Sequence, residues 1–340
     1  MNDAVVDLEQ RYRSLLDGGN LSDALQALDA LLAAAPAQAN AWAHRGALLL
    51  QLGRPEAAAT ALAEAARLAP RDPEVRIARA TALLQSGGAD EAVEELDKAI
   101  RLGAVGSATW ATRGSALAAA GRLPEANHSF AHAATLPGAR SEVLNDWGVA
   151  LYAAGDASAA YEKFSSALAA RADNAEAAFN AGNALLRLGR VDEAIYILEQ
   201  VVATRADKPA ARLYLGSALE RANRHDDART HFAALAADGQ LPERIRARAS
   251  AGALSCDAEC TRWQGRDDAI DSLKQFVTDG VSFSPLVLHA ALDDPGVHRQ
   301  AAANYWAFET ASIAQRPATR LSARKSNRLR VGYMSSDFRE

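Results

Sequence analysis

One property limits what this chain can fold into more than any other: its sequence repeats every 34 residues, without insertion or deletion, from Val5 to Pro242. A period of that length fits a helix, a turn and a second helix. The sequence therefore predicts seven stacked helical pairs. The seven units cover residues 5–38, 39–72, 73–106, 107–140, 141–174, 175–208 and 209–242.

Small side chains recur at two places of the unit. The twentieth place is alanine throughout: Ala24, Ala58, Ala92, Ala126, Ala160, Ala194 and Ala228. The eighth place, on the facing helix, holds Tyr12, Gly46, Ala80, Gly114, Gly148, Gly182 and Gly216. Overpacking a close helix crossing costs about 1–3 kcal/mol, so small residues at such places predict two closely packed helices in each unit.

Bulky apolar residues fill two further places, and glycine fills a third. The eleventh place is leucine from Leu15 to Leu219, and the twenty-fourth is leucine or phenylalanine from Leu28 to Phe232. These spacings put the side chains on one helical stripe, which predicts a core. The fifteenth place is glycine in six units and Asn223 in the seventh, as suits a helix end that needs a left-handed residue.

Period, small residues and turn residues together resemble the tetratricopeptide repeat over residues 5–242. The resemblance implies an all-α fold, in which helix-turn-helix repeats form a right-handed superhelix with a concave inner surface. Such surfaces bind extended or helical peptides. The fold alone does not name the ligand, so the expected partner is a protein or peptide in the concave groove.

Composition and charge agree with this interpretation. Hydrophobic residues make up 49% of the chain and aromatic residues 6%, and alanine, the strongest helix former, dominates the apolar share. The net charge of −5 gives no reason to expect nucleic acid as a partner. The first ten residues are polar and acidic, and no apolar run reaches about 18 residues, so we expect neither export nor membrane insertion. The expected location is the cytoplasm.

After the repeats, residues 243–315 are expected to form a capping helix and a helical collar. Apolar spacing predicts helices over Glu243–Leu254, Asp267–Val277 and Ala301–Ile313, with a further segment that opens at Ser284. Residues 316–329 form a basic linker; from 316 to 330 the chain has six Arg or Lys and no acid. We expect residues after about Arg316 to be mobile in isolation.

The end of the chain has a different character. Arg-Leu-Arg-Val-Gly-Tyr-Met-Ser-Ser-Asp-Phe at 328–338 predicts one β-strand followed by a turn. This string resembles the opening of the catalytic domain in the O-linked N-acetylglucosaminyltransferases of the SPINDLY type, which carry tetratricopeptide repeats immediately upstream. Cys256-Asp257 is similar to that family's Cys-Asp-Trp step, with Ala258 in place of tryptophan. Ser284-Pro285-Leu286 through Asp294-Pro295 is similar to the bacterial members' Ser-Pro-Phe and Asp-Asp-Pro segment.

This second resemblance implies transfer of N-acetylglucosamine from UDP-N-acetylglucosamine to Ser or Thr of proteins, by two Rossmann-like lobes. Residues 330–340 would then be the truncated start of a GT-B catalytic domain. The family's histidine and nucleotide-binding lysine would follow Glu340, so no catalytic or cofactor-binding residue is carried over. Ser335, Ser336, Asp337 and Phe338 match motif positions only. The chain alone is predicted to be inactive, and the UDP-N-acetylglucosamine donor is expected only when the catalytic domain is present.

The resemblance also draws attention to the sixth place of each unit. These transferases carry an asparagine there, whose amide clamps a peptide backbone through its donor and its acceptor. Here the place holds Gln10, His44, Ala78, Thr112, Asp146, Asn180 and Tyr214, so only Asn180 fits fully. The candidate groove contacts are therefore Gln10, His44, Thr112, Asp146, Asn180, Asn183 and Tyr214.

Metal chemistry is not expected. Cys256 and Cys260, four residues apart, supply two ligands without a nearby histidine, so a reduced pair is the favoured interpretation. His128 and His132 share a helix face but have no third ligand. Trp42, Trp110 and Trp147 lie on first helices and are expected to pack in the core.

These observations favour a protein–protein interaction module, the partner-binding repeat arm of a protein O-GlcNAc transferase-like protein without its catalytic domain. Two alternatives stay open. The chain is the N-terminal fragment of an active UDP-N-acetylglucosamine-dependent transferase, or it is a repeat adaptor for secretion or chaperone machinery. The sequence does not give the oligomeric state.

Overall fold

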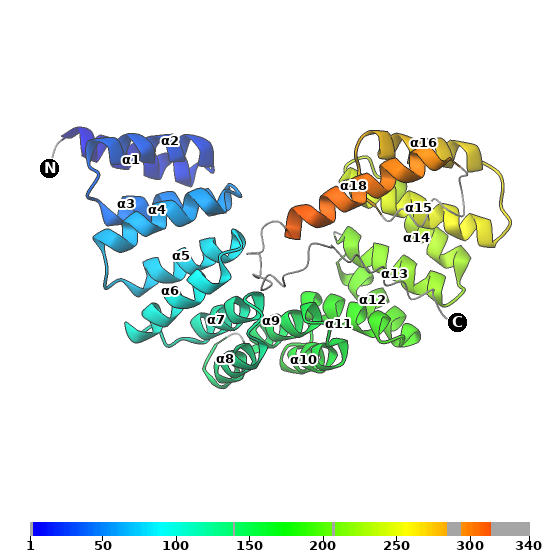
Figure 1. Ribbon diagram of the computed structural model, residues 1–340, viewed down its shortest axis with the longest axis horizontal. Coiled ribbons are helices and arrows are strands. Elements are labelled where there is room, and N and C mark those ends of the chain that lie inside the picture. The colour runs from blue at the N-terminus through cyan, green and yellow to red at the C-terminus, as the bar shows by residue number, and fades with distance from the viewer. Residues whose placement is uncertain (1–2, 139, 206–207, 284–293, 314–340) are drawn as a thin grey trace, which may run out of the picture.

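The computed structural model describes residues 3–138, 140–205, 208–283 and 294–313. Throughout those ranges every regular element is an α-helix, and the helices follow one another along an open arc (Figure 1). The expected all-α solenoid of helix pairs is therefore confirmed. The strand expected near the end of the chain, the basic linker and the segment that opens at Ser284 lie outside the described residues.

Each unit contributes two helices. The first helices are α1 (Asp3–Asp17), α3 (Ala39–Gln51), α5 (Pro73–Gln85), α7 (Ser107–Ala119), α9 (Arg140–Ala153), α11 (Ala175–Arg187) and α13 (Pro209–Arg221). The second helices are α2 (Leu21–Ala34), α4 (Pro55–Leu68), α6 (Ala89–Arg101), α8 (Leu123–Thr135), α10 (Ala157–Ala170), α12 (Val191–Thr204) and α14 (His225–Ala237). Each second helix packs against the first helix of its own unit and against that of the next, so the units stack in chain order.

Small residues let the two helices of a unit approach. All seven alanines of the twentieth place are fully buried. A Cβ added to Gly148 would lie 2.5 Å from a ring carbon of Phe164, which holds the twenty-fourth place of the same unit. A Cβ added to Gly46 would lie 2.4 Å from the Cγ of Leu62, again at the twenty-fourth place. The predicted close packing is confirmed, and the structure adds that the eighth place faces the twenty-fourth.

The fifteenth place ends each first helix as predicted. The six glycines and Asn223 at this place have left-handed backbones, with φ from 59° at Asn223 to 94° at Gly155. The next residue then returns its N–H to the last turn of the helix, and Arg54 N donates to Leu49 O at 2.8 Å. This geometry satisfies carbonyls that the end of a helix would otherwise leave unpaired.

The helix α15 (Glu243–Glu259) stands where the first helix of an eighth unit would stand. It packs against α14 and contacts α13, as each earlier first helix contacts its predecessors. Ser255 Oγ donates to Glu220 Oε1 of α13 at 2.7 Å. The capping helix expected over Glu243–Leu254 is therefore present, ends at Glu259, and continues the inner row of helices.

Two further helices complete the described part. The helix α16 (Arg266–Thr278) is one residue longer at each end than expected. The helix α18 (Pro295–Ile313) begins well before Ala301, because Asp294 Oδ1 accepts the N–H groups of Gly296 at 2.9 Å and Val297 at 3.2 Å and so caps its start. Figure 1 shows α18 running from α16 towards the middle of the arc.

The tryptophans of the first helices pack against the core. Trp42, Trp110 and Trp147 are half-buried against the apolar clusters between units. Trp42 Nε1 donates to Pro36 O at 2.9 Å, and Trp147 Nε1 donates to Asn127 Oδ1 at 2.7 Å. Among the described helices, none has the length and apolar character that crossing a bilayer requires.

Candidate functional site

The first helices form the inner side of the arc. In the lower part of Figure 1, α7 and α9 face the enclosed space, and α8 and α10 lie outside them. First helices of successive units contact one another from α3 with α5 to α13 with α15, whereas no two second helices in the described ranges make a comparable contact. In a curved stack of helices, neighbouring units lie closest together on the concave side. The contacts between successive first helices therefore also place these helices on the concave side.

The sixth place of each first helix points into the arc. The eighth place faces the second helix, and two residues back along a helix is a rotation of about 200°, which turns the side chain to the opposite side. We call the surface around the sixth-place residues the inner face. Its sixth-place residues, counting α15 as an eighth first helix, are Gln10, His44, Ala78, Thr112, Asp146, Asn180, Tyr214 and Arg248.

In the first four units the predicted contacts lie apart and do little together. Gln10 is exposed, and His44 is exposed while its ring stacks on that of Tyr12, with centroids 5.7 Å apart. Thr112 is half-buried and its Oγ1 donates to Ala108 O of the same helix at 2.9 Å. The hydroxyl therefore serves its own helix.

Units five and six join one predicted residue, Asn180, to a residue that was not predicted. Asn180 Nδ2 on α11 donates to Asn145 Oδ1 on α9 at 2.9 Å. Asp146, the neighbour of Asn145, is exposed to the interior of the arc. Loss of hydration there raises the pKa of the Asp146 carboxyl, and the charges of Glu176 and Glu142 raise it further, while a hydrogen bond from Asn145 lowers it. The surroundings of Asp146 thus disfavour its ionised form.

The acids around Asp146 differ in their partners. Glu142 forms an ion pair with Arg171, which also lies 3.6 Å from Asp173. Within the ranges that the structure describes, Asp146 and Glu176 take part in no ion pair. Two carboxyl groups without an ion-pair partner among the described residues therefore face the interior of the arc, one from α9 and one from α11.

Units six and seven present amide and aromatic groups. Asn183 is half-buried one turn after Asn180, and its Oδ1 has no hydrogen-bond donor among the described groups. The ring of Tyr214 packs edge-on against Phe179, with centroids 5.4 Å apart. Three of the predicted contacts, Asn180, Asn183 and Tyr214, therefore lie on the neighbouring helices α11 and α13.

Sequence reasoning missed the arginines of α15. Arg248 lies with its Cζ 5.9 Å from the centroid of the Tyr214 ring, and Arg244 occupies the second place of the same helix. Continuing the 34-residue count beyond Pro242 would have found both. It missed Asn145 and Phe179 as well, because both stand at the fifth place, to which no pattern drew attention.

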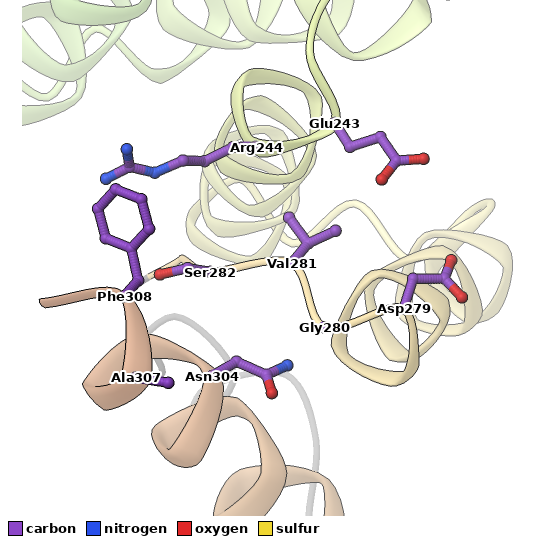
Figure 2. A pocket seen from close by; sticks show the side chains of 9 residues that line it. All are labelled: Glu243, Arg244, Asp279, Gly280, Val281, Ser282, Asn304, Ala307 and Phe308. Carbon is purple, nitrogen blue, oxygen red and sulfur yellow. The ribbon is translucent and has the colours of Figure 1, made fainter. Parts of the chain in front are cut away.

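A pocket lies beside Arg244, between α15 and α18 (Figure 2). The guanidinium of Arg244 lies 3.8 Å from the ring centroid of Phe308, and Asn304 Nδ2 of α18 donates to Val277 O at 2.8 Å. The hydroxyl of Ser282 is buried and has no partner among the described groups. The open pocket measures about 520 Å³ and is lined by Glu243, Arg244, Asp279, Gly280, Val281, Ser282, Asn304, Ala307 and Phe308.

The two residue pairs with a four-residue spacing, Cys256 with Cys260 and His128 with His132, have surroundings unlike a metal site. Cys256 is fully buried, and this burial is the main cause that raises the pKa of its thiol to about 12; Cys260 is half-buried. His132 packs edge-on against Trp110, with centroids 4.5 Å apart. The described ranges contain no group of three His, Cys, Asp or Glu side chains arranged to hold a metal ion.

Comparison with protein families identifies the repeats. A tetratricopeptide repeat model matches residues 49–111, 151–207 and 189–250, and a second model of the same description matches residues 11–73. Together these matches span residues 11–111 and 151–250, more than half of the chain. No curated protein sequence matches it.

Solved structures share the fold at low sequence identity. A tetratricopeptide repeat protein from Parabacteroides merdae is 14% identical, with a TM-score of 0.59, over 73% of this chain and 98% of that one. PilW, a type IV pilus biogenesis factor, is 16% identical, with a TM-score of 0.53, over 61% and 96%. The APC/C hetero-tetramer Cut9-Hcn1 gives 20% identity and a TM-score of 0.51 over 70% and 48%. At these identities the likeness concerns the fold alone.

Proposed function

Because the chain belongs to the tetratricopeptide repeat proteins, we propose that it is a protein–protein interaction module whose inner face binds a peptide or protein segment. The observation that carries this proposal is Asp146. Its side chain packs no core, forms no ion pair with a described residue, and lies where its charge is disfavoured. Charged groups held in such surroundings are concentrated at functional sites.

The groups beside Asp146 suit an extended segment. The amides of Asn180 and Asn183 carry the donors and acceptors that a peptide backbone needs, and the Oδ1 of Asn183, although buried, has no donor among the described groups. The rings of Tyr214 and Phe179 offer an apolar contact. A protein ligand uses such a mixture better than a nucleic acid would, since the phosphates of a nucleic acid would be repelled by Asp146 and Glu176.

Selection of random twelve-residue peptides, displayed on phage, tests the proposal with the full chain as the target. We expect enrichment of related peptides, and we expect Tyr214→Ala to weaken their binding. Tyr196→Ala is the matched control, because Tyr196 is exposed on the second helix α12. Circular dichroism checks that both variants fold. Enriched peptides that bind the Tyr214 variant as tightly as the parent would place the site elsewhere.

We propose further that these repeats are the partner-binding arm of a protein O-GlcNAc transferase-like protein. The supporting residues are the string at 328–338 and the Cys256-Asp257 step. Asp257 has a structural task at that step, because its Oδ1 accepts from Arg229 Nε of α14 at 2.5 Å and joins the end of α15 to the last repeat. Reading the gene beyond the codon for Glu340 tests the idea; an immediate stop codon would count against it.

Two assays distinguish this proposal from the alternatives, an active transferase fragment and a repeat adaptor. Sugar transfer from UDP-N-acetylglucosamine to an acceptor peptide by these 340 residues would favour a fragment that is itself active. Enrichment of secretion or chaperone components in a pull-down would favour an adaptor. We propose a cytoplasmic location, supported by the two free cysteines, and cell fractionation tests it.

A further inference from the structure

The free charges at the second and sixth places of the first helices are sorted by sign along the arc. Asp146 and Glu176, on α9 and α11, are exposed and in no ion pair with a described residue. Arg244 and Arg248, on α15, are exposed, and among the described residues they contact aromatic rings and form no ion pair. We propose that the inner face binds an extended peptide whose ends carry opposite charge, with its cationic side chain against α9 and α11 and its acidic group against α15. This inference rests on the proposed function and adds the chemical class of the partner.

The negative end of the inner face consists of two carboxyl groups whose places in the repeat direct them into the arc. Asp146 stands at the sixth place of α9 and Glu176 at the second place of α11. The charge of Glu176 contributes to the raised pKa of Asp146, so the two carboxylates share one electrostatic environment. A cation placed between them would relieve the repulsion that each exerts on the other.

The positive end uses the same two places of the repeat, the second and the sixth, on a first helix further along the arc. Arg244 and Arg248 occupy the second and sixth places of α15, and Arg246 between them is half-buried against Phe276. Two acids, Glu243 and Asp279, also line the adjoining pocket. Figure 2 shows the carboxylates of Glu243 and Asp279 pointing away from the guanidinium of Arg244, so the charges that this end presents to the inner face are those of Arg244 and Arg248. The rings of Phe308 and Tyr214 hold Arg244 and Arg248 in place, so less side-chain freedom is lost when an anion binds.

At the second and sixth places, the middle of the face carries neither sign. Arg187 and Arg221 stand at the other end of α11 and α13, at the thirteenth place, where they donate to the backbone oxygens of Tyr152 and Leu186. Asn180, Asn183, Phe179 and Tyr214 lie between the two ends. Amides suit a peptide backbone and rings suit an apolar side chain, so this stretch accommodates neutral residues. A ligand of uniform charge would meet repulsion at one end of the face, whereas a ligand with separated charges meets attraction at both.

The length of the ligand follows from the helix spacing. Three steps separate α9 from α15, and packed helices lie about 8–10 Å apart, which gives roughly 27 Å. An extended chain advances about 3.3 Å per residue. The cationic and acidic residues of the peptide should therefore be separated by about seven to nine residues.

The test combines the phage selection with neutralised proteins, all as full chains. One protein carries Asp146→Asn with Glu176→Gln, and a second carries Arg244→Gln with Arg248→Gln. The control carries Glu162→Gln with Asp192→Asn, two exposed acids of the second helices α10 and α12. Binding of an enriched synthetic peptide is then measured by fluorescence anisotropy, with the peptide's Lys or Arg, or its Asp or Glu, replaced by Gln in turn.

The parent and the control should enrich peptides in which Lys or Arg stands about seven to nine residues from Asp or Glu. Neutralising either end should weaken binding about two- to five-fold, the range for exposed ion pairs. Replacing the matching peptide charge should then cost nothing further in that variant. Enriched peptides without charge separation, or variants that bind like the control, would overturn this inference while leaving peptide binding intact. Failure to enrich any peptide would overturn the proposed function as well.

Discussion

The substitution Gly148→Ala isolates the contact that holds a helix pair together. On propensity alone, alanine inside a helix is favoured over glycine by about 1 kcal/mol. At Gly148, however, the new Cβ would lie 2.5 and 2.6 Å from two ring carbons of Phe164. Phe164 is 1% exposed, so its ring is enclosed on all sides by the close-packed core. Overpacking of this kind costs about 1–3 kcal/mol, so we expect a net loss of up to about 2 kcal/mol of unfolding free energy.

A second substitution shows whether this contact is the cause. Unit three carries Ala80 at the eighth place and Leu96 at the twenty-fourth, and both are fully buried. Gly148→Ala together with Phe164→Leu reproduces that natural pair in unit five. We expect the double variant to be more stable than the sum of the single changes predicts, by about 1 kcal/mol.

Hydrogen exchange of the amides in α9 and α10 measures the effect where it arises, and urea unfolding followed by circular dichroism at 222 nm measures it for the whole chain. The reasoning is refuted if Gly148→Ala slows exchange in α9 and raises stability, because propensity would then outweigh packing. It is equally refuted if the two substitutions are additive.

Three shorter predictions follow from the same structure. Gly189→Ala should cost about 1–2 kcal/mol in urea unfolding, because φ is 76° there, whereas Asn223→Gly should be neutral within a few tenths. Asp146→Asn should stabilise the protein near neutral pH, because folding raises the pKa of the Asp146 carboxyl. The stability of the parent protein therefore falls as the pH rises through the unfolded and then the folded pKa of this group. Melting curves from pH 3 to 8 should show that the difference between variant and parent vanishes in acid. A thiol reagent at pH 8 should modify Cys260 and leave Cys256 unreacted until the chain unfolds, because burial raises the pKa of the Cys256 thiol to about 12; equal rates in the folded protein would contradict this.

The core was predictable from sequence because its constraints are local and periodic. The same spacing that puts Ala126 and Phe130 on one stripe in unit four does so in every unit, so seven copies report one packing solution. Left-handed residues such as Gly155 were predictable for the same reason, since one backbone geometry ends each first helix.

The capping helix was predicted, but its place in the inner row of helices was not, because only half of the repeat pattern persists there. Counted onward by 34, the twentieth place becomes Arg262 instead of alanine, and the twenty-fourth becomes Arg266. The second helix therefore cannot approach as before, and α16 begins only at Arg266. The helix α15 still packs on α14 and keeps the inner row going, which is how Arg248 joins the inner face.

The candidate site was only partly predictable because its contacts cross between units. Asn180 was identified from its place, but its partner Asn145 lies 35 residues earlier on another helix. The pKa of Asp146 depends on Glu176, which no period connects to it. Such pairs depend on how far successive helices are rotated, and a repeat length does not specify that rotation.

Photo-crosslinking tests most directly whether the inner face is the binding surface. A photoreactive phenylalanine analogue replaces Asn183 or Tyr214 on first helices, and in separate proteins Glu162 or Gln200 on second helices. After irradiation with a selected peptide, we expect crosslinks from the two first-helix positions and none from the second-helix positions. Crosslinks that form from Glu162 or Gln200, with the first-helix positions silent, would contradict the account.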